Sequence, residues 1–538
     1  MLSERGRGRQ NRRTVMTDRF LILAPIFLFF AALVAAALYV ERAGNRAGKR
    51  IGGSENAARS DAARRFTGEY FLGSRSLKGV VLAMSLIATY GSVSSFVSGP
   101  GIAWQLGLGW VVFAAPQIIA GFFILGLIGK RIALVSRATG SITVIDVLRA
   151  RFGSDLLANL CAVSLLLFFA AMMTGQFIGG AAIFSEAAGV ESTTGLLLFG
   201  CLVVLYTAFG GYRTVAWTDA VCALLMIVGM LMLGGAIIDS AGGFEPAMQA
   251  AALAGLDDPQ APLELSSMLS PTADGALPFG LLFSAWILVG FGTAGLPQSA
   301  VRCMSYRTTS DLHLAMIVST VVCGALMIGL TTLGVLARGV PGLELAGASS
   351  DHLIPRLIAQ HMSPVAAGIT LIGPLAATMS TVSSLLIAAS SAIVKDLALH
   401  YRPDLENAPK LLSRLSVGAT LLIGLAAMAF AVKPLDLIAW INMAAFGGLE
   451  LAFLLPLSLG LFWRRANAAG ALLSIGGGLA VYFSLMLTKT SLFGLHAVVP
   501  AFAAAAVLFW AGSIFGRPTP QHRLRAFFPS AQQSLKRD

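Results

Sequence analysis

The residues of this chain that could do chemistry are small hydroxyl residues and glycines placed inside long apolar segments. One cluster is Ala88–Ser95 (ATYGSVSS), and Gly99-Pro100-Gly101 follows it. A membrane-spanning helix that carries such residues midway can unwind there, which leaves backbone carbonyl oxygens free to bind a cation. Close packing of helices through their small residues would explain the same composition.

A second interrupted segment contains Gly290, Gly292, Gly295 and Pro297. It lies in the seventh apolar span, five spans after the one that holds Ala88. Two spans interrupted by Gly and Pro at corresponding positions of two halves indicate a transporter with a binding site midway across the membrane. A simple proline kink is the alternative explanation.

The third cluster is Thr378–Ser384 (TMSTVSS). Its neighbouring hydroxyls at Ser380 and Thr381 can reach one ion only where the helix packs beside free carbonyls. Neutral oxygen ligands of this kind suit a hard cation such as sodium. Alternatively, the hydroxyls bond back to carbonyls of their own helix.

Two carboxylates also fall within apolar spans. Asp219 enters a long apolar run directly after Gly210–Thr218, and Glu450 follows Gly447-Gly448-Leu449. An ionisable group inside a span is costly and indicates a functional site. Asp219 could instead lie near the membrane interface or cap a helix, and Glu450 could pair with a polar group of a neighbouring helix.

The elements that must position these residues are membrane-spanning helices. Of the 538 residues, 56% are hydrophobic and 12% are charged, against about 25% charged in soluble domains. This composition excludes a soluble enzyme, a disordered protein and a fibrous protein. Segments of span length predict an all-α polytopic membrane protein with about 13 transmembrane helices, near residues 20–41, 77–98, 109–129, 157–186, 193–210, 215–239, 277–299, 312–337, 363–393, 411–431, 436–461, 468–487 and 495–515.

The distribution of charge predicts the orientation of these spans. The net charge is +12, but the basic residues lie in short loops, so positive-inside topology explains them better than nucleic-acid binding does. The loops that hold Arg302 and Arg307 and the C-terminus are predicted to be cytoplasmic, and the acidic segment 240–274 and the N-terminus outside. Because arginines before Met16 contradict this rule, we expect translation to start at Met16. We find neither the spacing of a metal site or disulfide framework nor an HExxH or GxSxG motif, so we expect no enzyme.

Several of these motifs resemble those of the sodium/solute symporter family. Gly210–Asp219 resembles the family's signature at the start of one span, Met379-Ser380-Thr381 resembles its sodium-site motif, and Gly460–Asn467 with Gly470 resembles a later block. The resemblance runs from about residue 20 to about residue 515. It implies a LeuT-like fold with two inverted repeats of five helices.

The resemblance also implies how the chain is divided. An N-terminal tail (1–19) and an extra transmembrane helix (20–41) precede a cytoplasmic linker (42–76). The inverted-repeat core (77–461) is followed by two further transmembrane helices (462–516) and a cytoplasmic tail (517–538).

Carried over by position, the resemblance implies a set of site residues. Sodium would bind the carbonyls of Ala88, Gly91 and Ala377 and the hydroxyls of Ser380 and Thr381, and Asp219 would take part in sodium coupling. The substrate would lie midway across the membrane, near Tyr90, Ser94, Ser95, Gln176, Trp286 and Gln298. No Arg or Lys is expected at the centre of a span, so helix dipoles and hydroxyls would meet a substrate's negative charge.

The implied function is sodium-coupled symport of a small organic anion by alternating access, with pantothenate as the first expectation. Another monocarboxylate or an amino acid such as proline is an alternative cargo. A transporter-like sensor acting with a separate signalling partner is an alternative of another class. The expected partners are sodium, a small carboxylate and the lipid bilayer, with no cofactor, nucleic acid or obligate protein partner. The resemblance implies a bacterial inner membrane.

Overall fold

The computed structural model describes residues 17–35, 67–68, 70–72, 75–256, 262, 266–343, 345, 347–433 and 438–529. In these ranges the chain is helical, with short loops and one isolated bridge between Leu77 and Tyr306. Eleven described helices are long and apolar enough to cross a membrane, or up to thirteen if two bent pairs are each counted as one span. This matches the predicted number. The predicted start at Met16 and most of the predicted linker lie outside the described residues.

The described helices follow one another with short connections. The first part of the chain contains the helix Thr17–Ala35, α3 (Gly79–Tyr90), η2 (Ser94–Ser98), α4 (Gly99–Leu106), α5 (Leu108–Ala114), η3 (Ala115–Ile119), α6 (Ala120–Phe122), η4 (Phe123–Gly129), α7 (Lys130–Thr139), α8 (Val144–Phe152), α9 (Asp155–Ala188), α10 (Ser192–Ser240) and α11 (Phe244–Leu253). The second part contains α12 (Phe279–Ala285), η7 (Trp286–Gly290), η8 (Phe291–Gly295), α13 (Pro297–Met304), α14 (Thr309–Leu336), η10 (Ser350–His352), α15 (Leu353–His361), α16 (Pro364–Ser391), η11 (Ala392–Ala398), α17 (Leu399–Tyr401), α18 (Pro409–Ala431), α19 (Ile438–Phe462), α20 (Ala468–Leu487), α21 (Val498–Phe515) and α22 (Gln521–Phe527).

Both segments predicted to be interrupted are bent. The chain turns by 63° between α3 and the helices from Ser94 to Leu106, and by 43° between the segment Phe279–Gly295 and α13. Pro297 begins α13, where its fixed φ fits the first turn and its missing N–H costs nothing. The two bends therefore fall where Gly and Pro interrupt the hydrophobic pattern.

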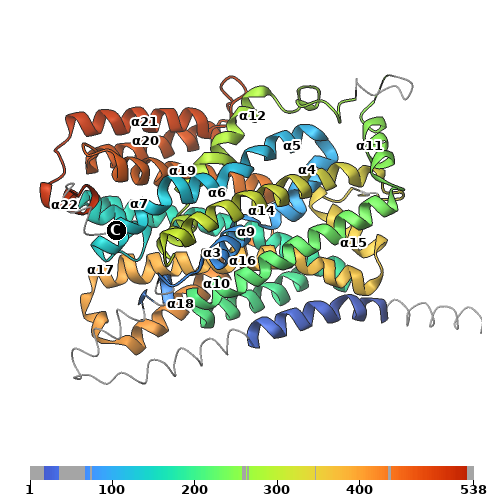
Figure 1. Ribbon diagram of the computed structural model, residues 1–538, viewed down its shortest axis with the longest axis horizontal. Helices are drawn as coiled ribbons and strands as arrows, with labels where there is room; N and C mark the ends of the chain where they lie inside the picture. The colour runs from blue at the N-terminus through green and yellow to red at the C-terminus, as the bar shows by residue number, and fades with distance from the viewer. Residues whose placement is uncertain are drawn as a thin grey trace, which may run out of the picture.

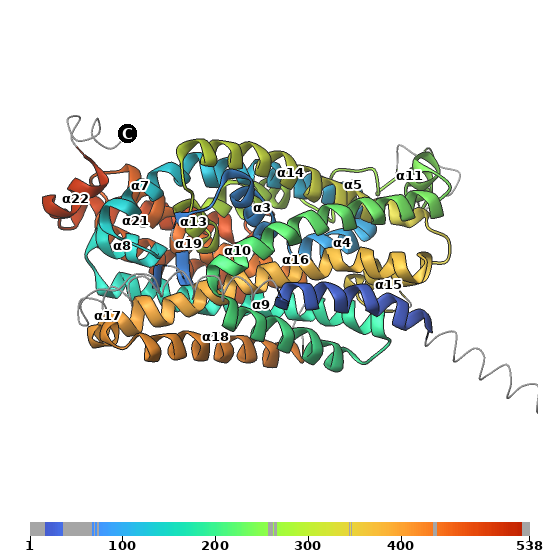
Figure 2. The same cartoon turned by 60° about the horizontal axis from the view of Figure 1, so that its bottom comes forward.

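The helix that carries the third cluster lies at the centre of the molecule. In the span Pro364–Tyr401, 94% of the most apolar window is buried, against 28–56% for most of the other spans. Helices α10, α9 and α3 pack around α16 (Figures 1 and 2). A polar side chain on α16 therefore faces protein on almost every side, and its polar atoms need partners there.

Helices outside the core lie at opposite edges of Figure 1. Thr17–Ala35, in dark blue, packs on α9 through Phe30 and Phe184, whose ring centroids are 6.1 Å apart. Helices α20 and α21, in red, pack on each other and on α19. Fewer of their residues are buried, since one side of each helix faces the surroundings.

Helix α10 consists of two spans joined at a glycine. Gly211 has φ 63° and ψ 175°, a conformation that residues with a Cβ rarely adopt. A Cβ added there would also come within 2.8 Å of the Tyr70 ring. The second span begins at Thr214, so Asp219 lies within a helix and does not cap one.

Candidate ion and substrate site

The break after α3 frees backbone carbonyls at the centre of the molecule. Gly91 ends α3 with φ −67° and ψ 121°, and the chain resumes as the helix turn η2 at Ser94. The N–H of Val93, within the break, donates to Oε1 of Gln176 on α9, at 3.1 Å. The carbonyls of Ala88 and Gly91 precede the break and are turned towards α16.

Two hydroxyls of α16 meet these carbonyls. Ser380 Oγ donates to the Ala88 carbonyl at 2.8 Å, and Thr381 Oγ1 lies 3.2 Å from the Gly91 carbonyl. Both hydroxyls also lie within 3.1 Å of the Ala377 carbonyl on their own helix. The structure thus brings together all five residues predicted to bind sodium, although bonding back to the helix also occurs.

This cluster offers a cation only uncharged oxygen atoms. Ser380 is completely buried and Thr381 is 1% exposed. Carbonyl and hydroxyl oxygens are the ligands that hard cations prefer, and each hydroxyl can rotate to present a lone pair. The donor set therefore fits sodium, and its use as a sodium site stays a prediction.

A buried ion pair lies one turn farther along the same helices. Asp219 Oδ2 of α10 accepts from Arg302 Nη2 of α13 at 2.8 Å and from Ser85 Oγ of α3 at 3.1 Å. Arg302 Nη2 also donates to Ser384 Oγ of α16 at 2.7 Å. The side chains of Asp219 and Arg302 are 1% and 2% exposed. Four helices, including both broken spans, therefore meet at one pair of opposite charges.

Arg302 corrects one sequence expectation. We placed it in a basic loop and expected no Arg within the spans, but it lies buried on α13. Its guanidinium also donates to the carbonyls of Ser85 and Gln298. Burial of a charge in the membrane requires such partners, and the apolar pattern around Arg302 did not reveal that Asp219 would be one of them.

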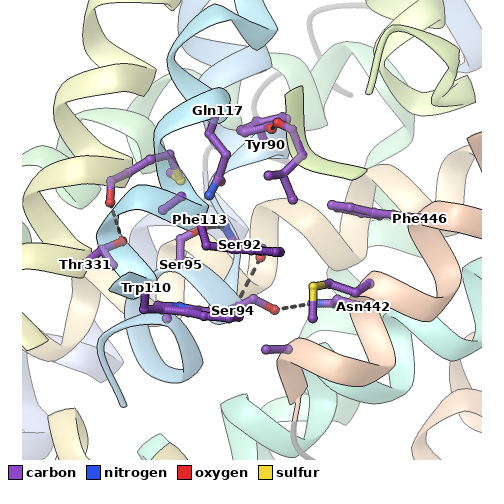
Figure 3. A pocket seen from close by; sticks show the side chains of 16 residues that line it. Tyr90, Ser92, Ser94, Ser95, Trp110, Phe113, Gln117, Thr331, Asn442 and Phe446 are labelled. Carbon is purple, nitrogen blue, oxygen red and sulfur yellow. Dashed lines mark hydrogen bonds between the residues drawn. The ribbon is translucent and has the colours of Figure 1, made fainter. Parts of the chain in front are cut away.

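A pocket opens beside the break after α3. Figure 3 shows Tyr90, Ser92, Ser94 and Ser95 from the broken span facing Asn442, where an Asn442 Nδ2 to Ser94 Oγ hydrogen bond joins the two sides. The remaining lining is largely apolar and aromatic and comes from four other segments: Gly99, Trp110, Phe113, Ala114, Gln117, Val289, Met327, Thr331, Ala439, Met443 and Phe446. A mostly apolar pocket with a few amide and hydroxyl groups is typical of small-molecule sites.

Three of the six residues predicted to bind substrate line this pocket, and three do not. Tyr90, Ser94 and Ser95 do. Gln176 and Gln298 are buried elsewhere, and the Gln176 amide supports the backbone of the break. Trp286 is 49% exposed, because η7 directs it to the outside of the bundle. The structure therefore does not bring Trp286 to the pocket.

Sequence reasoning missed several polar groups of the pocket. Asn442 and Gln117 are amides inside apolar spans, which is a signal that could have identified them. Trp110 and Phe113 carried no such signal, since aromatic residues occur on many membrane helices. Their role depends on which face of α5 turns inward.

With this geometry in place, comparison with known proteins identifies the class. A model of the Sodium:solute symporter family matches residues 70–478, and the chain belongs to this family. A sodium/pantothenate symporter of Escherichia coli (strain K12) is 42% identical over 473 residues, which cover 88% of this chain and 95% of that protein. A sodium/pantothenate symporter of Haemophilus influenzae is 40% identical over 84% of this chain and 91% of that protein. An osmoregulated proline transporter of Bacillus subtilis is 28% identical over 81% and 86%.

Solved structures show the same fold. A Na⁺-coupled sialic acid symporter in a substrate-bound outward-open state superimposes with a TM-score of 0.74 at 19% identity, over 93% of this chain and 99% of that chain. A nucleobase-cation-symport-1 family transporter in a closed conformation gives 0.52 at 14% identity, over 85% and 97%. The protein is thus a multi-pass membrane protein with the LeuT-like fold predicted from its sequence.

Proposed function

We propose that this protein is a symporter that carries pantothenate into a bacterial cell together with sodium. The observation that carries the proposal is the pocket beside the break after α3, which shares that break with the cluster around Ser380. The two relatives at 42% and 40% identity are sodium/pantothenate symporters, and this supports pantothenate over proline as the cargo.

Coupling follows from the shared break. Sodium held by the carbonyls of Ala88, Gly91 and Ala377 and the hydroxyls of Ser380 and Thr381 would fix the unwound segment against α16. Ser94 and Ser95, on the same segment, would then be positioned for the substrate. Each ligand would raise the affinity for the other by the same factor.

The chemistry of the pocket fits a small polar carboxylate. Asn442 and Gln117 supply amide groups, Ser94 and Ser95 supply hydroxyls, and no Lys or Arg is among its lining residues. Pantothenate has a carboxylate, two hydroxyls and an amide, which such groups can bind. Its carboxylate would lie towards the start of η2 at Ser94, where backbone N–H groups point outwards.

Transport after binding would follow the alternating-access scheme. The two bent spans move relative to their surroundings and close the pocket on one side before it opens on the other. The Asp219–Arg302 pair joins these spans, so we propose that Asp219 takes part in sodium coupling. We further propose that the N-terminus lies outside and the C-terminus in the cytoplasm.

Uptake of radiolabelled pantothenate tests this function. The chain would be expressed in cells that lack their own pantothenate carrier, and an inward sodium gradient would be compared with potassium. We expect accumulation that requires sodium. Correct membrane insertion without pantothenate uptake would refute the substrate, and the same cells would then be tested with other monocarboxylates and proline.

Two substitutions test the cation site. Ser380→Ala and Thr381→Ala each remove one ligand, so we expect the sodium concentration for half-maximal uptake to rise about tenfold, equivalent to about 1.4 kcal/mol. Ser391→Ala is the matched control, because the Ser391 hydroxyl on the same helix bonds only to the Ala388 carbonyl. Unchanged sodium dependence in both test variants would refute the site.

A further inference from the structure

Glu450 is a carboxylate that the proposed function does not use. It lies on α19 and is completely buried. Among the described residues, neither of its carboxylate oxygens has a hydrogen-bond partner, and no Lys or Arg makes an ion pair with it. A lone ionised carboxylate in the interior of a membrane protein costs many kcal/mol, so it must be neutralised in place.

The nearest backbone of the second broken span shows how neutralisation could occur. A Cβ built on Gly292 would lie 2.2 Å from the Ile287 carbonyl oxygen and 2.7 Å from Glu450 Oε2. Two hydrogen-bond acceptors therefore approach the same small space beside Gly292. They repel one another unless a proton or a cation lies between them. Protonation of Glu450 would supply an O–H that can donate to Ile287.

A proton fits this space better than a metal ion does. Sodium would need a shell of several oxygen ligands, and Ile287 is the one backbone oxygen placed beside the carboxylate at Gly292. Glu450 is also not among the residues that line the neighbouring pocket. A proton needs only one acceptor and no added volume.

The surrounding titratable groups do not supply a charge that could replace the proton. The phenol groups of Tyr90 on α3 and Tyr482 on α20 are its titratable neighbours. Their hydroxyls donate to the carbonyls of Val289 and Ala444. The His496 ring lies beyond Tyr482, with ring centroids 6.3 Å apart, and Cys323 of α14 lies beyond Tyr90.

We propose that Glu450 is a proton-binding site that holds the second broken span against α19. The proton comes from water and leaves to water when the span moves away and exposes the carboxylate. The site adjoins the pocket, because Val289 and Phe446 line the pocket and lie one turn or less from Ile287 and Glu450 in sequence. Loss of the proton at high pH would loosen this wall of the pocket.

Infrared difference spectroscopy of the purified full-length protein tests the proton directly. At pH 7 we expect a carboxylic acid C=O band that is absent from Glu450→Gln. The band should shift in wild-type protein labelled with ¹³C-glutamate, which provides a readout even if the variant fails to fold. Glu186→Gln is the matched control, since Glu186 lies beside His352 and Arg356 at 3.3 and 3.7 Å. The band should remain in that control.

Other outcomes would overturn the proposal. A wild-type spectrum at pH 7 without a ¹³C-sensitive acid band would refute the proton site. A Glu450 carboxylate band that differs between sodium and potassium buffers would assign the site to a metal ion instead. Because this measurement requires no transport, it is independent of whether pantothenate is the cargo.

A second arm tests the effect on transport. Uptake by the wild type should fall with rising pH above neutrality, at most about tenfold per pH unit for a single proton. Glu450→Gln, which is neutral at every pH, should show a flat profile over the same range if it inserts. An equal decline in both proteins would show that Glu450 does not control transport.

Discussion

At the scale of single residues, the buried ion pair separates a charge that stabilises from one that couples. Asp219 and Arg302 satisfy one another, and Ser85 and Ser384 complete their hydrogen bonds. The same pair lies one helical turn from Ser380. A change at Asp219 can therefore affect both the folded protein and the cation cluster, and an experiment must measure the two effects separately.

Asp219→Asn is expected to impair sodium-driven uptake more than membrane insertion. Asn can still accept hydrogen bonds, but it leaves the Arg302 charge unpaired, at a cost of about 3–5 kcal/mol for a broken buried pair. Uptake per inserted molecule and the unfolding temperature would both be measured. Asp239→Asn, at an exposed position of the same helix, is the control. Normal sodium-driven uptake by Asp219→Asn would make Asp219 a purely structural residue.

Residue types with a strong chemical preference were predictable, and residues defined by orientation were not. Ser380, Thr381 and the carbonyls of Ala88 and Gly91 meet as predicted because a break and a hydroxyl cluster are local features of the sequence. Trp286 and Gln298 lie on the correct span, but the register of η7 and α13 turns them away from the pocket. That register depends on tertiary packing.

At the scale of elements, glycine and proline determine where the spans break. Gly211 divides α10 because only glycine readily takes its backbone conformation beside the Tyr70 ring. Pro297 starts α13 after the bend at Gly295. Such breaks are visible in the sequence. The π-helical turns η2 and η7 that flank them are not, since no residue type specifies that geometry.

The connection between α20 and α21 should be sensitive to acid. Burial lowers the pKa of His496 from 6.5 to about 4, and its Nδ1 accepts from the Val498 N–H at 3.3 Å. The neutral ring therefore stabilises the fold above pH 6.5, and this contribution is lost as pH falls towards 4. At 1.36 kcal/mol per pKa unit it amounts to at most about 3 kcal/mol.

Thermal unfolding between pH 7 and pH 4 measures this contribution. The unfolding temperature of the wild type should fall over that range, and His496→Gln should lose less than the wild type does. His313→Gln, at an exposed position, should follow the wild type. Parallel curves for wild type and His496→Gln would show that the His496 ring does not bind a proton on acid unfolding.

At the scale of the whole molecule, thirteen spans and a basic side predict the orientation in the membrane. An odd number of spans places the termini on opposite sides, and Lys/Arg-rich loops remain in the cytoplasm. The chain segment between α20 and α21 should then lie outside, and the one between α19 and α20 inside. Arg302 no longer counts as a loop residue, but the remaining basic loops favour the same side.

Cysteine labelling in intact cells checks this orientation. Lys489→Cys and Arg465→Cys introduce thiols at exposed positions of these two connections. An impermeant maleimide should label the first and not the second until the membrane is permeabilised. The unaltered chain controls for its native cysteines, including the exposed Cys201. The reverse pattern of labelling would invert the topology.

The uncharged oxygens around Ser380 have an electrical consequence. A cluster built from carbonyls and hydroxyls has no net charge when empty, and the nearby Asp219 and Arg302 cancel one another. The unloaded carrier would therefore return across the membrane without moving charge in this region. One sodium travelling with one monocarboxylate would also carry no net charge, so the roughly 2.3 kcal/mol per charge available from 100 mV would not drive that step. An inward current during uptake would consequently count the cations that accompany each anion beyond the first.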